Sequence, residues 1–408
     1  MKRDGGVKLL TITPLRRLIG AIALSAIGNG LVLPFFVVYL HSVRGFSISQ
    51  AGLLLSWMGL SQILFSPLVG TAVDKFGAVV MLRISLLLGA LGFSLLGFAH
   101  TSWQVLGVVT ICAISQGTLW PAQGSLLAQL SPDRERSFGL QFAFLNLGFG
   151  IGGVGAALII SAPTERAFHI LYIADGISFL IYLLLIFNLK TPERTEVERQ
   201  KSAEGSWRQV LQDKRLLRIW IVAFIAILFG YSQLEAGFSS YSIYVAELSP
   251  GSLAWAYAAN TFVIALMQMR FVKWVRNWRR SRALMLATSL WALSWIVVGS
   301  AKWWPTVLVL ILAQVIFAVG EMIWSPVAPA LVNDLAPDEM RGRYNALFSG
   351  AWQSSLILGP GVAGLLIGTG QGFSWVVVVV MGSLFASFLA FRLHLILTPS
   401  QERGRMTE

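Results

Sequence analysis

Twelve long apolar stretches, separated by short polar gaps, account for most of this 408-residue chain. A hydrocarbon core about 30 Å thick is crossed by a helix of roughly 20 apolar residues. Within lipid a backbone must satisfy its own polar groups, which excludes unclosed strands. We therefore predict an all-α integral membrane protein. The predicted transmembrane helices cover Leu18 to Leu40, Ser49 to Val73, Val79 to Ala99, Trp103 to Leu127, Phe138 to Ser161, Phe168 to Leu189, Leu217 to Tyr241, Leu253 to Trp274, Ala283 to Ala301, Trp303 to Val332, Tyr344 to Gly368 and Phe373 to Leu397.

Positive charge is divided unevenly among the gaps. Of the 31 lysines and arginines, only Arg44, Arg166 and Lys302 lie in one alternating set of gaps, and all the others lie on the opposite side. Short loops rich in Lys and Arg stay in the cytoplasm, so both termini are predicted to be cytoplasmic. The net charge of +12 then reflects membrane topology and not nucleic-acid binding.

The longest polar stretch divides the chain into halves of six apolar stretches each. We predict an N-terminal six-helix bundle over residues 1–189, a cytoplasmic linker over residues 190–216, and a C-terminal six-helix bundle with a short cytoplasmic tail over residues 217–408. The linker has mixed charges and few apolar residues, which favours a flexible or partly helical segment and not an independent domain.

The two halves carry a parallel repeat. One constant offset aligns Pro121 with Pro326 and Asp133 with Asp338, and a glycine-rich stretch follows in each half. Parallel six-helix repeats place a substrate site at their interface near the bilayer midplane. Rocking of one half against the other would then give alternating access.

A short motif follows the second apolar stretch. The segment GTAVDKFG places Gly70, Asp74, Lys75 and Gly77 on the pattern Gly-x-x-x-Asp-Arg/Lys-x-Gly. This resembles the signature of the major facilitator superfamily, and the resemblance covers essentially the whole chain. It implies a conformational switch in which Asp74 caps a neighbouring helix end, Lys75 pairs with an acidic residue, and the cytoplasmic side is held closed. The alternative is that both are solvated loop charges.

The fifth stretch contains NLGFGIGGVGAAL, which resembles the glycine-rich segment of the drug-antiporter branch of that family. The resemblance implies that Gly152 and Gly153 belong to the conformational switch, because small residues let helices approach closely and slide. Packing alone explains the same glycines. Ala113 stands where this branch often has an arginine, so a proton relay through that arginine is not carried over.

Three carboxylates fall inside the predicted spans: Asp175, Glu235 and Glu321. Ionisable residues in lipid are costly and indicate function, so we predict that these three couple transport to protons. Glu321 is the strongest candidate, because it lies well inside its span and its repeat mate is Gln116. Glu235 lies among small and polar residues that indicate a local break in the seventh span. The alternatives are a carboxyl satisfied by neighbouring groups for Glu321, a wetted interfacial carboxylate for Glu235, and a structural hydrogen bond for Asp175.

Aromatic and amide side chains accompany these carboxylates. A cavity with aromatic walls and few carboxylates suits lipophilic cations, although ordinary helix packing accounts for many of the rings. In the resembled family the first, fourth, seventh and tenth spans line the cavity. The predicted substrate-binding residues are Asn29, Phe36, Gln116, Trp120, Asn146, Gln233, Trp324 and Gln353.

Enzyme chemistry finds little support. There is no Walker loop, the four histidines are scattered, and the single cysteine, Cys112, forms neither a disulfide nor a thiolate metal site. We therefore expect no catalytic residue, metal or cofactor. The sequence predicts a monomeric exporter of amphipathic or cationic small molecules in exchange for protons, in a bacterial cytoplasmic (inner) membrane. The alternatives are a proton-coupled importer, a specific metabolite exporter, or a lipid flippase of the same fold.

Overall fold

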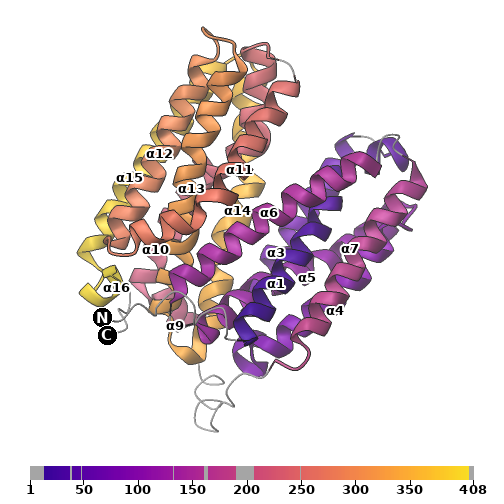
Figure 1. The fold of residues 1–408 in the computed structure, drawn as a ribbon, viewed down its shortest axis with the longest axis vertical. Coiled ribbons are helices and arrows are strands. Elements are labelled where there is room, and N and C mark those ends of the chain that lie inside the picture. Colours follow the sequence, from indigo (N-terminus) through magenta and orange to yellow (C-terminus); the bar gives the residue numbers. More distant parts are fainter. Residues whose placement is uncertain are drawn as a thin grey trace. The chain divides into compact units, whose positions relative to one another are not determined.

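The computed structural model describes residues 13–36, 39–46, 48–131, 133–159, 164–189, 206–248 and 250–403. Every regular element in these segments is helical (Figure 1), which confirms the predicted all-α class. Ten of the described helices are long and apolar enough to cross a membrane, and α3 and α11 add helices of 29 and 26 residues. The long helices are α1 (Thr13–Val32), α3 (Ile48–Phe76), α4 (Ala78–Leu96), α5 (Ser102–Leu130), α6 (Arg134–Ile159), α7 (Glu165–Ile186), α10 (Lys214–Phe229), α11 (Pro250–Val275), α12 (Arg280–Ser300), α13 (Val307–Leu335), α14 (Arg341–Gly368) and α15 (Gly372–Arg392).

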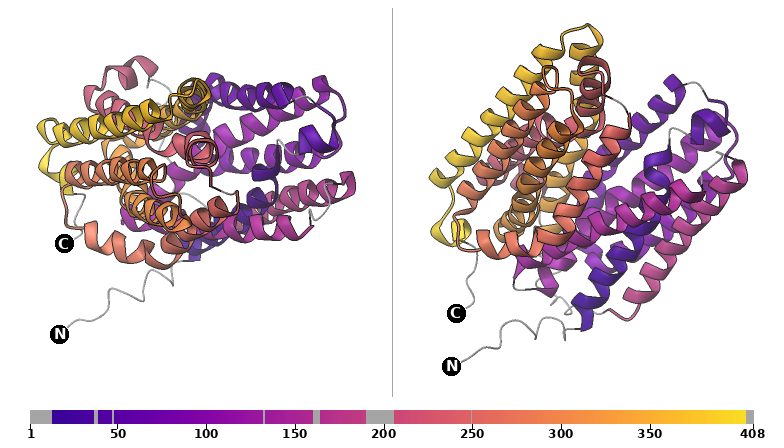
Figure 2. Two further views of the ribbon diagram at one scale, coloured as in Figure 1. Left: turned by 90° about the horizontal axis from the view of Figure 1, so that it is seen from above. Right: turned by 45° about the horizontal axis from the view of Figure 1, so that its top comes forward.

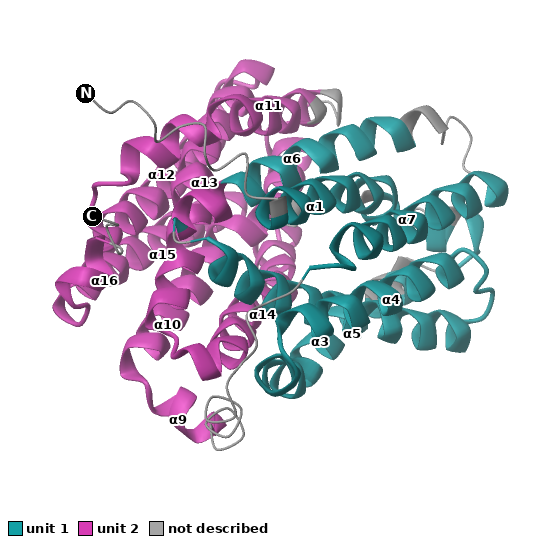
Figure 3. Ribbon diagram, turned by 60° about the horizontal axis from the view of Figure 1, so that its bottom comes forward, with its two compact units in different colours: residues 1–133, 140–203 teal, residues 134–139, 204–408 magenta. Residues whose placement is uncertain are grey.

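The chain divides into two compact units (Figure 3). Unit 1 comprises residues 1–133 and 140–203, and unit 2 comprises residues 134–139 and 204–408. The first turn and a half of α6 thus belongs to unit 2 and the remainder of that helix to unit 1. The long helices of each unit run alongside one another (Figure 2).

In unit 1, α4 packs on α5 and α7, α1 packs on α7, and α3 packs on α5. The α4–α5 contact is tied by two reciprocal bonds, in which the Ser85 hydroxyl donates to the Ser115 carbonyl at 2.9 Å and the Ser115 hydroxyl donates to the Ser85 carbonyl at 2.8 Å. Small hydroxyls bonded this way let two helices approach closely in lipid without leaving a polar group unsatisfied.

In unit 2, α12 packs on α13 and α15, α11 on α13, and α10 on α14. Trp291, Trp295 and Trp375 are fully buried in its core. The Trp291 ring stacks on Phe317 with centroids 5.2 Å apart, and its indole N–H donates to the Phe317 carbonyl at 3.3 Å. These rings fix the middle of α13, where Glu321 lies.

The seventh span is not one continuous α-helix. The helix α10 ends at Phe229, and the backbone turns at Gly230. It continues as a 3-10 helix, η4 (Tyr231–Gln233), followed by two short π-helices, η5 (Leu234–Phe238) and η6 (Tyr241–Val245). Gly230 packs against Trp291, and a β-carbon there would collide with the indole ring. The small and polar residues of this segment therefore coincide with an irregular helix, as their composition indicated.

Short helical elements complete the described chain. They are η2 (Leu33–Phe35), η3 (Tyr39–Val43), α9 (Trp207–Gln212), η7 (Asp338–Met340), η8 (Leu393–Leu395) and α16 (Pro399–Arg403). The start of α9 carries a full capping box, in which Ser206 and Gln209 each bond the other's backbone N–H. Asp213 then begins α10 by accepting from the N–H groups of Arg215 and Leu216.

Candidate functional site

Glu321 lies in the middle of α13, and its side chain is buried in unit 2 with 3% of its surface exposed. Its Oε2 accepts a hydrogen bond of 2.7 Å from Nδ2 of Asn260 on α11. The same Nδ2 lies 3.5 Å from the carbonyl oxygen of Gln314, one and a half to two turns earlier on α13. No salt bridge reaches Glu321 from the residues that the structure describes. The carboxyl is therefore held by one neutral amide and not by a fixed cation.

Aromatic rings share the helix face of Glu321. Phe317 lies four residues before it and Trp324 three residues after it, spacings that place side chains on one face of a helix. Trp324 is 5% exposed, and its ring lies 5.5 Å from Trp291. The Tyr231 ring in η4 reaches Phe317 at 6.2 Å and Trp352 at 4.6 Å. The carboxyl thus belongs to a region rich in π-faces.

Gln233, one of the predicted binding residues, is fully engaged by protein groups. Its Nε2 donates to the carbonyl oxygens of Leu228 at 2.9 Å and Gly359 at 3.2 Å. Its Oε1 accepts from the indole N–H of Trp375 at 2.9 Å. These bonds join η4 to α14 and α15. The side chain of the neighbouring Glu235 lies outside the described residues.

Unit 1 brings a second polar pair together. Gln116 on α5 donates to the Oδ1 of Asn29 on α1 at 3.4 Å, and both residues are mostly buried. One turn beyond Gln116, Trp120 is 37% exposed. Phe36, just after η2, is buried. Asn146 on α6 turns its amide back to its own helix, donating to the Phe142 carbonyl at 3.0 Å.

Asp175 on α7 is completely buried, with no exposed surface. Its Oδ1 accepts from the Ser178 hydroxyl at 3.3 Å, and its Oδ2 has no hydrogen-bond partner among the described residues. Gly28 of α1 packs directly on this carboxyl, so that a β-carbon on Gly28 would collide with both Asp175 and Ser178. The carboxyl is enclosed in a tight contact between α1 and α7.

The glycine-rich segment of α6 packs on α1. A β-carbon on Gly148 would lie 2.6 Å from Ala26, and one on Gly152 would lie 2.9 Å from Gly30. Gly30 in turn meets the backbone of Phe149. Gly153 has no atom of the described residues within 4 Å of its hypothetical β-carbon. The two predicted switch glycines therefore differ, since Gly152 makes a close helix contact and Gly153 does not.

The GTAVDKFG motif forms the end of α3, and its last residue, Gly77, is the N-cap of α4. Asp74 is fully buried, whereas Lys75 is exposed with its ammonium 5.3 Å from the Phe76 ring. Gly77 has a φ of +91°, a left-handed conformation that glycine adopts without strain. Gly70 is buried one turn before Asp74. Burial of Asp74 argues against the simple alternative of a solvated loop charge for this residue.

An ionic network in unit 2 was not predicted from the sequence. Arg280 at the start of α12 bonds Glu135 at 2.9 Å and Asp334 at 2.7 Å. Asp334 also pairs with Arg134. These side chains are largely buried, so the network ties the first turn of α6 to α12 and α13. Arg134, Glu135 and Asp334 lie at the two loops that the repeat relates. The match between these loops could have pointed to a shared role, but membrane topology alone explains their charges without naming a partner.

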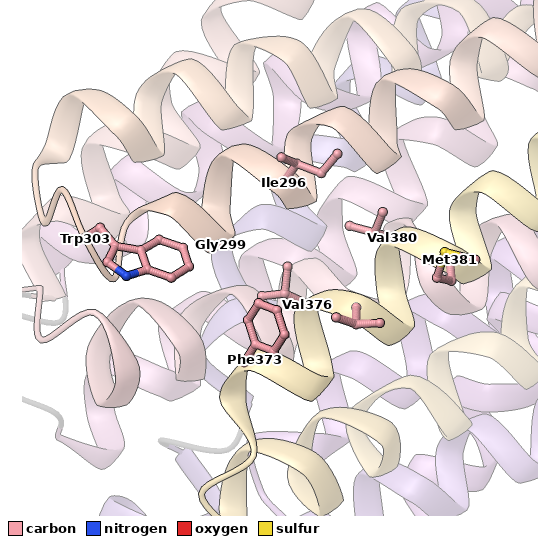
Figure 4. Close-up of a pocket in the computed structure, with 8 residues that line it drawn as sticks. Ile296, Gly299, Trp303, Phe373, Val376, Val380 and Met381 are labelled. Atoms are coloured by element: carbon pink, nitrogen blue, oxygen red, sulfur yellow. The ribbon is translucent and has the colours of Figure 1, made fainter.

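The apolar groove of about 320 Å³ on unit 2 lies between α12 and α15 (Figure 4). Its walls include Ile296, Phe373, Val376 and Met381, and the Trp303 ring closes one end. Among the residues that the structure describes, no charged side chain lines it. A groove of this composition accommodates hydrocarbon, so it does not mark a site for a polar or charged substrate.

The sequence matches the Major Facilitator Superfamily over residues 18–249 and again over residues 235–405. The chain belongs to the Major Facilitator Superfamily. Members of this superfamily are membrane transporters and not enzymes, and they bind small-molecule substrates within the membrane. The double match agrees with two repeated six-helix bundles, so the predicted family and fold are confirmed.

Relatives of this superfamily member include two bacterial proteins. The chain is 27% identical over 354 residues to the quinolone resistance protein NorA of Staphylococcus aureus strain MRSA252, covering 83% of this chain and 86% of NorA. It is 24% identical over 339 residues to YqjV of Bacillus subtilis strain 168, an uncharacterized MFS-type transporter, covering 82% of each.

Solved structures of the superfamily share the fold. The human organic anion transporter MFSD10 superposes with a TM-score of 0.72 at 15% identity, covering 93% of this chain and 99% of that one. The proton:xylose symporter XylE, solved with 6-bromo-6-deoxy-D-glucose, gives a TM-score of 0.73 at 14% identity, covering 96% and 98%. At these identities the likeness concerns the fold alone.

Within this superfamily member, the predicted binding residues differ in the groups that they contact. Asn29 pairs with Gln116 in unit 1, and Trp324 shares the α13 face of Glu321 in unit 2. The amides of Asn146 and Gln233 are bonded to backbone carbonyls, while Gln353 is half-buried beside Trp352. Asn260, which holds Glu321, was missed. A polar residue in the middle of an apolar span was the signal that could have found it.

Proposed function

We propose that this chain is a proton-coupled exporter of amphipathic or cationic small molecules that works by alternating access. The observation that carries the proposal is the Glu321 carboxyl, which is buried at mid-helix and bonded to the neutral amide of Asn260. Ionisable groups at such depth are expensive and occur mostly where ions or protons are handled. Glu321 is therefore our proposed coupling residue.

Substrate transport would be coupled to proton transport because a proton and a cationic substrate exchange at Glu321. A buried carboxylate without a salt bridge is stabilised either by a proton or by a cation brought beside it. A proton and a cationic substrate would therefore compete for Glu321. Because each is released only when the other binds, transport of the substrate in one direction requires transport of the proton in the other.

The proposed substrate class rests on the side chains near Glu321 and on a relative. Rings of Tyr231, Trp352 and Trp324 offer apolar surface and π-faces that attract organic cations. NorA is named for resistance to quinolones, which are amphipathic small molecules. We propose that Asn29, Gln116, Trp120 and Gln353 contribute further contacts, and that Glu235 is a secondary proton site. Asp175, enclosed between α1 and α7, would instead have a structural role.

The proposal also covers the membrane location, the moving elements and the domain organisation of the chain. We infer a bacterial cytoplasmic-membrane location with both termini cytoplasmic, from the uneven distribution of the 31 lysines and arginines. The Asp74 motif and the Gly152 contact would belong to the elements that change between states. We further propose bundles over residues 1–189 and 217–408, joined by the linker 190–216, and a monomer as the working unit.

The test measures efflux of ethidium, a fluorescent lipophilic cation, from pump-deficient bacteria that express this chain. Wild type is expected to expel ethidium, and a protonophore is expected to stop it. Glu321→Gln, expressed to the same membrane level, is expected to lose the protonophore-sensitive part. If well-expressed wild type expels nothing, the proposed substrate class is wrong. Accumulation instead of efflux would indicate an importer, and lipid movement in liposomes would indicate a flippase.

A further inference from the structure

Asn260 is the only side chain of the described residues that forms a hydrogen bond with Glu321. The bond of 2.7 Å is short for an N–H···O contact, as expected when the acceptor carries charge. Asn260 is 8% exposed and Glu321 is 3% exposed. Water competes little with this bond, so the amide decides how well the carboxylate is stabilised.

The Asn260 amide can serve both protonation states of Glu321. Its N–H group donates to a carboxylate, and its Oδ1 can accept from a protonated carboxyl after the amide turns over. Its second contact, at 3.5 Å to the Gln314 carbonyl, is at the limit of hydrogen bonding and holds the amide weakly. The amide is thus bound firmly through the carboxyl itself.

We propose that Asn260 is the positioning residue that sets the pH at which Glu321 takes up and releases its proton. The inference rests on the proposed function, in which Glu321 is the coupling carboxylate. Asn260 itself would neither bind substrate nor carry the proton. It would stabilise the ionised carboxylate and keep Oε2 in one place on the face of α13.

On the surrounding helices, the lysine and arginine residues lie several turns from the level of Glu321. On α11 the charged residues are Arg270 and Lys273, more than two turns beyond Asn260. The cations of α10, α12 and α14 lie near their first turns, at the end of unit 2 where Arg280 meets Asp334. The nearest titratable hydroxyl on α11 is that of Tyr257, which donates to the Leu234 carbonyl at 2.6 Å.

The direct test is an infrared titration of the purified full chain in lipid, following the carbonyl band of protonated carboxylic acids. The part of the band that is absent in Glu321→Gln reports Glu321. In Asn260→Leu the carboxylate loses its donor, so the charged form is less stable and the midpoint is expected to rise by about one to two pH units. Asn260→Ser, whose hydroxyl is too short to reach, is expected to raise it too.

Gln268→Leu is the matched control. Gln268 also lies on α11, is fully buried, and donates to the Met322 carbonyl on α13 at 3.1 Å, so its loss removes a bond between the same two helices without touching the carboxyl. The Glu321 midpoint is expected to stay within about 0.3 pH units of wild type. A shift as large as that of Asn260→Leu would overturn the inference, as would an unshifted midpoint in both Asn260 variants.

Ethidium efflux against pH separates this inference from the proposed function. The pH optimum should move upward in Asn260→Leu, and Asn260→Leu should have no added effect in a Glu321→Gln background. If Glu321→Gln keeps protonophore-sensitive efflux, the proposed coupling fails while the infrared result still decides the pairing. If Glu321→Gln abolishes efflux and the Asn260→Leu profile overlays wild type, the positioning role of Asn260 alone fails.

Discussion

Asp175 in unit 1 and Glu321 in unit 2 are both buried carboxyls on long helices, yet their surroundings differ. Asp175 receives one bond of 3.3 Å from Ser178 of its own helix, and Gly28 closes the space against it. Glu321 receives a bond of 2.7 Å from an amide on another helix. Burial is therefore common to both, while a polar partner on another helix distinguishes Glu321.

The difference concerns packing as much as hydrogen bonding. Around Asp175 the helices meet through glycine, and α1 is also held on its α6 side by Gly148 and Gly152. A carboxyl in such a contact has no room to change partners when its proton leaves. Around Glu321 the hydrogen bond comes from the Asn260 amide, whose second contact of 3.5 Å holds it weakly, so the amide can turn over when the proton leaves. We therefore expect changes near Asp175 to alter folding and changes near Glu321 to alter transport.

The largest expected effect is the loss of folded protein when a larger side chain replaces Gly28 beside Asp175. Gly28→Val would place two methyl groups where Asp175 and Ser178 already lie, and overpacking of this kind costs about 3 kcal/mol. We expect little folded protein, measured as the monodisperse peak in size-exclusion chromatography after detergent extraction. Gly20→Val on the same helix, where a β-carbon meets no atom of the described residues within 4 Å, should extract like wild type. Equal yields for both would refute the tight α1–α7 contact.

The next effect compares the two carboxyls by neutralising each. Glu321→Gln is expected to reduce protonophore-sensitive ethidium efflux to background while its melting temperature stays near that of wild type. Asp175→Asn keeps an oxygen for Ser178 and is expected to retain most of the efflux. Efflux assays and thermal melts on the same membranes give both quantities. The opposite pattern, with Asp175→Asn inactive and Glu321→Gln active, would reverse the assignment of the coupling residue.

These contrasts also show what the sequence can and cannot predict. The apolar stretches predict the helices because the bilayer fixes their length, and the ionisable residues inside them mark Asp175 and Glu321 at once. The pairing of Glu321 with Asn260 depends on how α11 and α13 are rotated about their axes. Neither a motif nor the repeat records that rotation, so the partner of the carboxyl was found only in the structure.

The glycines of α6 also show that a motif does not reveal which side of a helix faces its neighbour. Gly152 and Gly153 are neighbours in the sequence, and nothing in the motif separates them. Successive residues of a helix point about 100° apart, so one meets α1 and the other does not. The Arg280 network was missed for a similar reason, because charges that orient a membrane protein also form specific ion pairs once the helices are packed.

A smaller effect is expected from methyl groups added to those two glycines. Gly152→Ala would press on the backbone of α1 and is expected to lower stability by about 1–2 kcal/mol. Gly153→Ala meets open space, and the better helix propensity of alanine is worth up to about 1 kcal/mol in the other direction. Thermal melts of the two variants in one detergent measure the difference. Two equal shifts would mean that α1 is not held closely by α6.

The smallest expected effect comes from removing the hydroxyl donor of Asp175, the counterpart of removing the amide donor of Glu321. Ser178→Ala keeps the β-carbon beside Gly28 and deletes only the bond of 3.3 Å, which is worth about 1 kcal/mol or less. Because Asp175 is not expected to exchange its proton during transport, the pH optimum of ethidium efflux should not move. Efflux measured at a series of pH values for Ser178→Ala and Asn260→Leu compares the two donors directly. A matching shift in both variants would show that the two carboxyls titrate together in the transport cycle, and the distinction between a packed carboxyl and an exchangeable one would then be lost.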